Sequence, residues 1–180
     1  MLKQPDPPIR VYAASPGGFA ESTISYHRDL VQLLRDHGFE VLDPWELTPQ
    51  SEVEPVFLIV DYQERKDALF QMDKRIAGRN VEAIRTCDII LATLDGQEVD
   101  SGTACEMGMG YWDKKVVFGL RSDFRQSGEN DGCTINMQVE NCIHDSGGVL
   151  FTSLNGIREN IHLLVEGGLV SRQRCQTCDG

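Results

Sequence analysis

Residues 87–120 read CDIILATLDGQEVDSGTACEMGMGYWDKKVVFGL, and they indicate the fold class. Two short apolar runs, residues 88–93 and 115–120, are typical of strands that are covered on both faces of a parallel sheet. Between them lie a polar loop and a short glycine-rich stretch in which we expect a helix. The order strand, helix, strand is the repeating unit of an α/β fold.

The loop between these two predicted strands is rich in acidic residues. Asp95, Glu98 and Asp100 lie in it, and Glu106 follows in the expected helix. Open α/β sheets bind ligands at the carboxyl ends of their strands, which is where this loop lies. Glu106 has two possible roles. It could close a capping box with Thr103, or it could be an ionised nucleophile, kept charged by the dipole of the helix in whose first turn it lies.

The rest of the chain alternates between strands and helices. Further strands are expected at residues 9–14, 39–42 and 148–151. Helical periodicity and breaking residues predict the helices. They span residues 21–37, 63–85 (with a break near Gly78), 135–143 and 154–167. Residues 56–60 could be a strand or a helical turn, and we favour the helix.

This alternation predicts an α/β fold of the flavodoxin-like (Rossmann-like) type. We expect a five-stranded parallel sheet of order 2-1-3-4-5 with helices on both faces. That order places the loops after the first and third strands side by side. It therefore brings Tyr12, Phe19, Asp100 and Glu106 to one site.

The length of 180 residues fits one domain. We expect a flexible N-terminal arm at residues 1–8, a single domain at residues 9–168 and a mobile polar tail at residues 169–180. The arm has no apolar signal core, so the six cysteines are expected to be reduced and the protein cytoplasmic. The pair Cys175 and Cys178 has CxxC spacing, but one pair does not predict a metal site.

Charge narrows the class of partner. The net charge is −11 and the pI about 4.7, which argues against a nucleic acid polymer or an anionic membrane as partner. No apolar run approaches the length of a membrane span. The loop after the first strand has a glycine pair but lacks GxGxxG, and we expect no cofactor. A small molecule remains the expected partner.

Several stretches together resemble the nucleoside 2-deoxyribosyltransferase family, in the order that the family has them, over roughly residues 9–165. The principal stretch is DSGTACEMG at residues 100–108. The others are VYAASP at 11–16, DPW at 43–45, NVEAIRTCD at 80–88, KVVFG at 115–119, DFR at 123–125, and Asn136 with Met137.

The resemblance implies cleavage of an N-glycosidic bond with retention of configuration. Glu106 matches the nucleophile that forms a covalent glycosyl-enzyme. Asp100 matches an acid that holds the sugar and the nucleophile, and Tyr12 matches a tyrosine that orients the nucleophile. From the residues alone, Asp100 could equally be a helix cap and Tyr12 a core residue.

The resemblance also implies residues that bind substrate. Phe19 or Trp45 could stack on the base, or could only pack within the protein. Asn136 and Met137 match residues that a neighbouring subunit supplies, which implies a homo-oligomer with shared active sites. Asn136 could instead cap a helix.

Three further residues complete the expected site. Gly102 is expected to allow a ligand to approach closely. Asn80 stands where some family members have an Asp that protonates the leaving base. An amide cannot do this, although it can hydrogen-bond the base. The proton would then come from Asp100, Asp95 or water.

Three functions follow, in order of preference. The first is transfer of 2-deoxyribose between the nucleobases of 2′-deoxyribonucleosides, with nucleosides and nucleobases as the partners. The second is hydrolysis of nucleosides or of their 5′-monophosphates. The third is a nucleotide-binding module without turnover.

Overall fold

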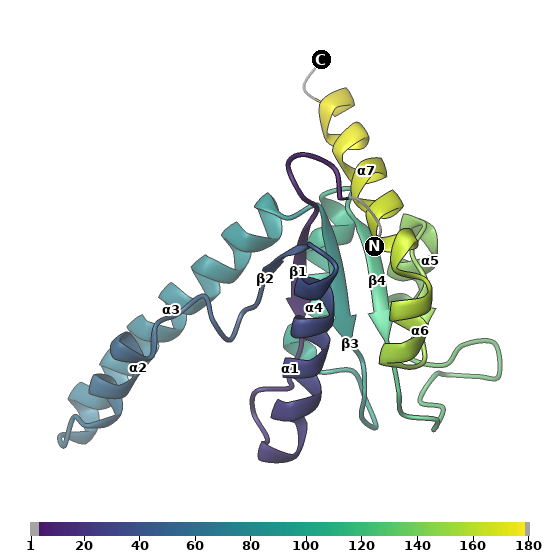
Figure 1. The fold of residues 1–180 in the computed structure, drawn as a ribbon. Coiled ribbons are helices and arrows are strands. Elements are labelled where there is room, and N and C mark those ends of the chain that lie inside the picture. The colour runs from purple at the N-terminus through teal and green to yellow at the C-terminus, as the bar shows by residue number, and fades with distance from the viewer. Residues whose placement is uncertain (1–3, 179–180) are drawn as a thin grey trace.

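The structure is a computed structural model that describes residues 4–178, and the side chains of residues 4–175. The described residues contain a parallel five-stranded sheet of order β2-β1-β3-β4-β5 (Figure 1). The prediction of the fold class is confirmed. The strands are β1 (Arg10–Ala14), β2 (Glu40–Leu42), β3 (Ile89–Thr93), β4 (Val116–Leu120) and β5 (Leu150–Phe151).

Helices cover both faces of the sheet (Figure 1). One face packs against α1 (Glu21–Asp36), α6 (Leu154–Glu159) and α7 (Ile161–Cys178). The other face packs against α3 (Tyr62–Thr86), α4 (Ser101–Trp112) and α5 (Met137–Ser146). The sheet thus separates two apolar layers.

Alternation along β1 decides which side chains reach the site. Successive residues of a strand point to opposite faces of the sheet. Val11 therefore lies in the layer under α1 and α7, whereas Tyr12 lies in the layer under α3 and α4. Tyr12 is paired with Ile90 of β3 and is fully buried. Its ring is a core residue, and only its hydroxyl is left to act in a site.

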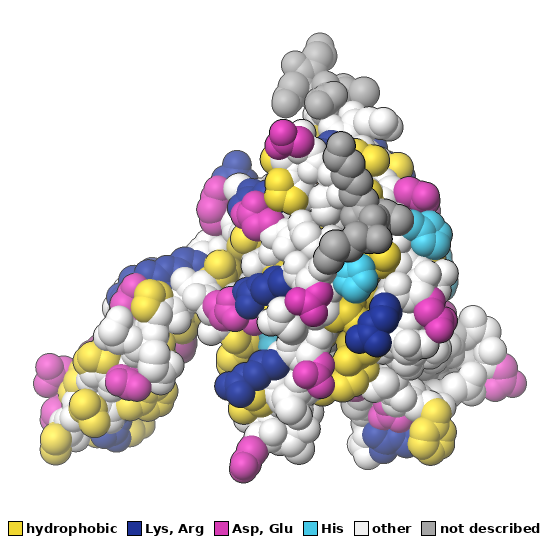
Figure 2. Space-filling view, viewed as in Figure 1, with side chains coloured by type: hydrophobic (Ala, Val, Ile, Leu, Met, Phe, Trp, Pro, Cys, Tyr) yellow, Lys and Arg dark blue, Asp and Glu magenta, His cyan; other side chains and the backbone are white. Residues whose placement is uncertain are grey.

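The helices α2 (Gln50–Phe57) and α3 form an arm that projects from the sheet (Figures 1 and 2). The predicted break near Gly78 is wrong, because α3 is continuous from Tyr62 to Thr86. A Cβ at Gly78 would meet no neighbour, so the glycine costs only its helix propensity, about 1 kcal/mol. The helix predicted at residues 56–60 is also wrong in its bounds, since α2 ends at Phe57.

The C-terminal helix is longer than the sequence predicts. The single helix predicted at residues 154–167 is wrong, because two helices, α6 and α7, lie there and α7 continues to Cys178. A Cβ at Gly167 would lie 2.8 Å from the ring of Phe118, so this glycine allows the helix to pack closely on the sheet. Beyond it, Ser171 accepts a hydrogen bond from the Val116 amide, and Arg172 pairs with Asp88.

The N-terminal segment and the C-terminal tail predicted from the sequence include residues 1–3 and 179–180, which lie outside the described residues. In the rest of the N-terminal segment, Gln4 donates a hydrogen bond to the His37 carbonyl, and the carbonyls of Pro7 and Pro8 accept hydrogen bonds from Arg172. None of the helices in the described part of the chain is long and apolar enough to cross a membrane. Over the same residues, no cluster of three or more His, Cys, Asp or Glu side chains could hold a metal ion.

Two glycines of α4 test how this helix packs. A Cβ at Gly110 would lie 2.4 Å from Cγ1 of Ile90, whereas a Cβ at Gly108 would meet no neighbour within 4 Å. We expect Gly110→Ala to lower the free energy of unfolding by about 1–3 kcal/mol through overpacking. Gly108→Ala should raise it by about 0.5–1 kcal/mol, because alanine favours the helix. Urea denaturation of both variants measures the difference, and equal effects would contradict the contact between α4 and β3.

Candidate active site

The site is built around the carboxylate of Glu106 on α4. The Tyr12 hydroxyl donates a hydrogen bond to Oε1 of Glu106 at 2.7 Å. Asn80 Nδ2, from α3, donates to the same oxygen at 3.4 Å. No hydrogen bond from any described residue reaches Oε2. One carboxylate oxygen is therefore held by two donors, and the other is free to react.

Asp100 caps the N-terminus of α4, whereas the predicted capping box has Thr103 as the cap. Its side chain accepts hydrogen bonds from the Thr103 amide at 2.9 Å and from the Thr103 hydroxyl at 3.2 Å. Thr103 is thus the third residue of the helix and not its cap. The capping-box interpretation of Glu106 is wrong, because Glu106 lies in the second turn and outside the reach of the cap. Asp100 is therefore a helix cap, which is one of the two roles that the sequence allows.

The surroundings of Glu106 act on its protonation in opposite directions. Burial raises the pKa of Glu106 above its ordinary value, and the nearby charge of Asp100 raises it further. The hydrogen bonds from Tyr12 and Asn80 favour the ionised form and lower the pKa. Burial and the charge of Glu106 also raise the pKa of Tyr12, so its hydroxyl stays a donor. The carboxylate is thus poorly hydrated but supported by two fixed donors.

A cavity of about 610 Å³ opens beside Glu106. It lies between α3, α4 and the segments that follow β1 and β2, at the carboxyl ends of the strands. Its volume is in the range of small-molecule sites. Its lining residues are Ser15, Phe19, Pro44, Trp45, Thr48, Gln50, Val53, Asp73, Ile76, Asn80, Asp100, Ser101, Gly102, Thr103 and Glu106.

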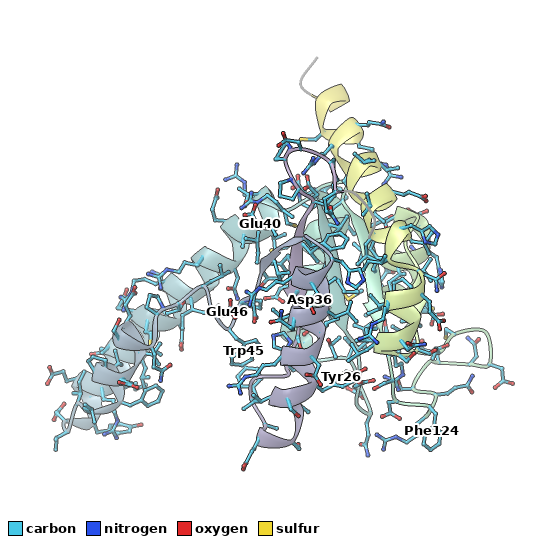
Figure 3. All side chains as sticks on the ribbon, in the orientation of Figure 1. Tyr26, Asp36, Glu40, Trp45, Glu46 and Phe124 are labelled. Carbon is cyan, nitrogen blue, oxygen red and sulfur yellow. The ribbon has the colours of Figure 1, made fainter. Side chains whose placement is uncertain are left out.

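Phe19 and Trp45 form an aromatic corner of the cavity. Their ring centroids are 4.7 Å apart and their planes meet at 87°. Figure 3 shows Trp45 on the side of α1 that faces the arm. Its indole donates a hydrogen bond to the Ser15 carbonyl at 3.0 Å, and a Cβ at Gly18 would lie 2.2 Å from the indole ring. Phe19 remains 79% exposed, so its ring can contact a planar ligand.

A buried pair of side chains, His27 and Asp43, supports the aromatic corner. His27 Nε2 and Asp43 Oδ1 are 3.0 Å apart, and both side chains are buried. The same Asp43 oxygen accepts a hydrogen bond from the Trp45 amide at 3.0 Å. His27 and Asp43 therefore form a pair that holds the backbone carrying the indole.

Four predicted site residues do not line the cavity of their own chain. Tyr12 is one of them and reaches the site only through its hydrogen bond to Glu106, and the others are Asp95, Asn136 and Met137. The Asp95 carboxylate accepts hydrogen bonds from the Ser122 amide and hydroxyl and from the Asp123 amide at 2.6–2.8 Å, and so it anchors the loop after β4. Asn136 caps α5 through the amides of residues 138 and 139, as the alternative from the sequence has it. Met137 is exposed at the start of α5.

Part of the cavity is supplied by the arm and was not predicted from the sequence. Thr48, Gln50 and Val53 come from residues 46–66, where periodicity is weak. Asp73 and Ile76 are on α3, and their spacing from Asn80 is the sequence feature that could have predicted their place in the cavity. Positions 73, 76 and 80 are separated by three and four residues, so they share one face of a helix. That face points into the cavity.

Comparisons with known proteins find one family model and several solved structures that are similar to this chain. The family model described as "Nucleoside 2-deoxyribosyltransferase" matches residues 11–143, most of the chain. A 2-desoxiribosyltransferase from Leishmania mexicana is similar with a TM-score of 0.59 and 23% identity, over 88% of this chain and 98% of that one. A 2-deoxyribosyltransferase from Bacillus psychrosaccharolyticus has a TM-score of 0.52 and 25% identity, over 86% and 95%.

A CMP N-glycosidase from Clostridium botulinum has a TM-score of 0.51 and 17% identity, over 86% of this chain and 99% of that one. The structures below 25% identity share the fold with this chain. The comparison with curated proteins found no match. The region matched by the family model includes every residue that the sequence predicts for the site.

The hydrogen bond between Tyr12 and Glu106 can be tested by titration. Tyr12→Phe removes the donor and keeps the ring in the core. Because the donor stabilises the ionised carboxylate, its loss should raise the pKa of Glu106 further. Carbon-13 NMR of the labelled Glu106 carboxyl measures this. Tyr111→Phe is the control, since its hydroxyl contacts Asp145 instead. An unchanged or lower pKa in Tyr12→Phe would contradict the arrangement.

Proposed function

The chain belongs to the nucleoside 2-deoxyribosyltransferase family, and from this we propose that it transfers 2-deoxyribose between nucleobases, with Glu106 as the nucleophile. The observation that carries the proposal is the state of the Glu106 carboxylate. Oε1 is held by Tyr12 and Asn80, while Oε2 is unbonded beside a cavity that has room for a nucleoside. A nucleophilic carboxylate needs this combination of fixed orientation and one free oxygen.

The reaction proceeds in two displacements at the anomeric carbon. Oε2 attacks this carbon, the bond to the base nitrogen breaks through an oxocarbenium-like state, and the base leaves with the bonding electrons and takes up a proton. A nitrogen of a second base then attacks the same carbon and loses its proton. The ester bond to Glu106 breaks, and the carboxylate is restored. Two inversions give net retention.

The donors around Glu106 assist both displacements. Glu106 must be ionised to attack, and burial works against this by raising its pKa. Tyr12 and Asn80 offset part of this effect, and they stabilise the carboxylate again when it leaves. Asp100 uses Oδ2 to cap α4, and we assign its other oxygen to the sugar.

The proton for the leaving base has fewer possible sources than the sequence suggests. Asn80 has no acidic proton. Asp95 is bonded to the loop after β4 and does not line the cavity. Asp100 and water therefore remain as donors in this proposal, and Asn80 serves the base as a hydrogen-bonding partner.

Hydrolysis of nucleosides is the alternative, in which water replaces the second base. A 5′-monophosphate substrate is disfavoured, because none of the cavity-lining residues is a Lys or Arg. Arg121 is buried and donates to the backbone carbonyls of Leu94, Gly96 and Arg125. Arg125 is paired with Asp123. Both arginines are thus engaged away from the cavity.

We further propose that the protein is a homo-oligomer, with Asn136 and Met137 reaching the cavity of a neighbouring subunit. Hydrophobic side chains are exposed towards the end of the arm, where Figure 2 shows them among charged ones. Patches of this kind mark interaction surfaces. The exposed residues of this region are Phe57, Leu58, Val60, Tyr62 and Phe70.

Product analysis tests the proposed function. The protein is incubated with 2′-deoxyinosine and adenine, and separately with thymidine and adenine, and the nucleosides are separated by chromatography. We expect 2′-deoxyadenosine from the native protein and a loss of at least about 1,000-fold in Glu106→Gln, since the nucleophile is removed. Glu98→Gln is the matched control, because Glu98 is an exposed acid that does not line the cavity.

Each other result has a separate meaning. Free base and 2-deoxyribose without 2′-deoxyadenosine would establish the hydrolase instead. Binding without any turnover would leave the nucleotide-binding module. Equal activity of Glu106→Gln and the native protein would overturn the role of Glu106.

A further inference from the structure

One wall of the cavity offers hydrogen-bond acceptors that have no partner. Asn80 Oδ1 is buried and lacks a hydrogen bond. Asp73, which lines the same cavity, makes no hydrogen bond or ion pair with any described residue. We call Asp73, Ile76 and Asn80, which share one face of α3, the acceptor wall. Asp73 is exposed to solvent, so a ligand in the cavity meets one buried acceptor without a partner, Asn80 Oδ1, and one exposed carboxylate here.

The chemistry of Glu106 fixes which way the Asn80 amide faces. An ionised carboxylate accepts hydrogen bonds and donates none, so Asn80 must turn its NH₂ group to Glu106 Oε1, as observed at 3.4 Å. Oδ1 is then directed away from Glu106. Because a buried acceptor without a partner is unfavourable, this oxygen requires a donor from the bound ligand.

The acceptor wall extends along α3 away from Glu106. With a rise of about 1.5 Å per residue, Ile76 lies about 6 Å and Asp73 about 10 Å along α3 from Asn80. The reacting sugar carbon must lie at Glu106, and Asn80 is bonded to Glu106. Asn80 is therefore at the junction of sugar and base, and the base extends along Ile76 towards Asp73.

We propose that the acceptor wall selects nucleobases that carry an exocyclic amine, adenine and cytosine, over their oxo counterparts, hypoxanthine and uracil. The inference rests on the proposed function, since it assigns the substrate class of the same site. An exocyclic amine supplies two N–H donors to a wall that has only acceptors. An oxo group in its place sets lone pairs against Asn80 Oδ1 or the Asp73 carboxylate.

Thr48 and Gln50, elsewhere in the cavity lining, favour neither the amine nor the oxo bases. Thr48 Oγ1 is also buried without a partner, and Gln50 lines the cavity close to it in the chain. A hydroxyl and a primary amide can each donate or accept, so they adapt to either class of base. The discrimination therefore comes from α3.

The experiment compares substrates that differ only in this group. The kcat/KM values of 2′-deoxyadenosine and 2′-deoxyinosine are measured as donors, with cytosine and uracil deoxynucleosides as a second pair. We expect the amine to be preferred by about 10- to 100-fold, as for a site in which a buried acceptor loses its partner. Asp73→Asn should reduce the preference several-fold, because an amide can also donate.

Two further variants separate selectivity from catalysis. Asn80→Leu removes the acceptor, and it lowers turnover of both substrates because Glu106 loses a donor. The ratio between the substrates is therefore the readout, and we expect it to fall. Asp67→Asn is the control on the same helix. Asp67 is exposed, contacts Gln63 and does not line the cavity, so the ratio should not change.

Several results would overturn the inference. They are equal use of both bases, a preference for the oxo base, or a ratio that neither Asp73→Asn nor Asn80→Leu changes. If Asn80→Leu changes only the discrimination between adenosine and 2′-deoxyadenosine, Oδ1 serves a sugar hydroxyl and the inference is also wrong.

The inference can be decided even if the proposed function fails. With no turnover of any nucleoside, calorimetric titration of the native protein with free adenine and with free hypoxanthine is still informative. Tighter binding of adenine, weakened in Asp73→Asn, would support the acceptor wall. Equal binding, or none, would overturn it.

Discussion

The hydrogen bond from Tyr12 to Glu106 is the contact on which the site depends. It joins the core of the sheet to α4, the helix that carries the Glu106 carboxylate. Tyr12 is fully buried and fixed by its place in β1, so its hydroxyl has one position. Because the pKa of Glu106 is raised by burial, the carboxylate needs donors that are already in place. The parallel order that sets β1 beside β3 makes this possible, since α4 follows β3.

The arm supplies the rest of the site. A continuous α3 brings Asn80 to Glu106 at one end and carries Ile76 and Asp73 along the cavity. The same helix projects beyond the sheet (Figure 1), and hydrophobic side chains of this projecting part are exposed. A segment that both lines the cavity and offers an apolar surface can couple assembly of subunits to the shape of the site.

The sheet and its order could be predicted because buried parallel strands leave short apolar runs, and the switch point then brought Tyr12, Phe19, Asp100 and Glu106 together. Other features depend on competition between similar groups, which a single sequence does not resolve. Asp100 and Thr103 are both good helix caps, and Asp100 takes that position. Asp95 has the same chemistry as Asp100, but its carboxylate is used by the loop after β4. The part of the cavity that α2 forms comes from a segment with weak periodicity, so it could not be predicted.

The central claim is that Glu106 becomes covalently bonded to the sugar. The direct test is mass spectrometry of protein that is quenched in acid during turnover of a 2′-deoxyribonucleoside, followed by peptide mapping. We predict one 2-deoxyribosyl group per chain, on the peptide that contains Glu106, and none in Glu106→Gln. A sugar attached to any other residue, or turnover at the native rate by Glu106→Gln, would contradict the account.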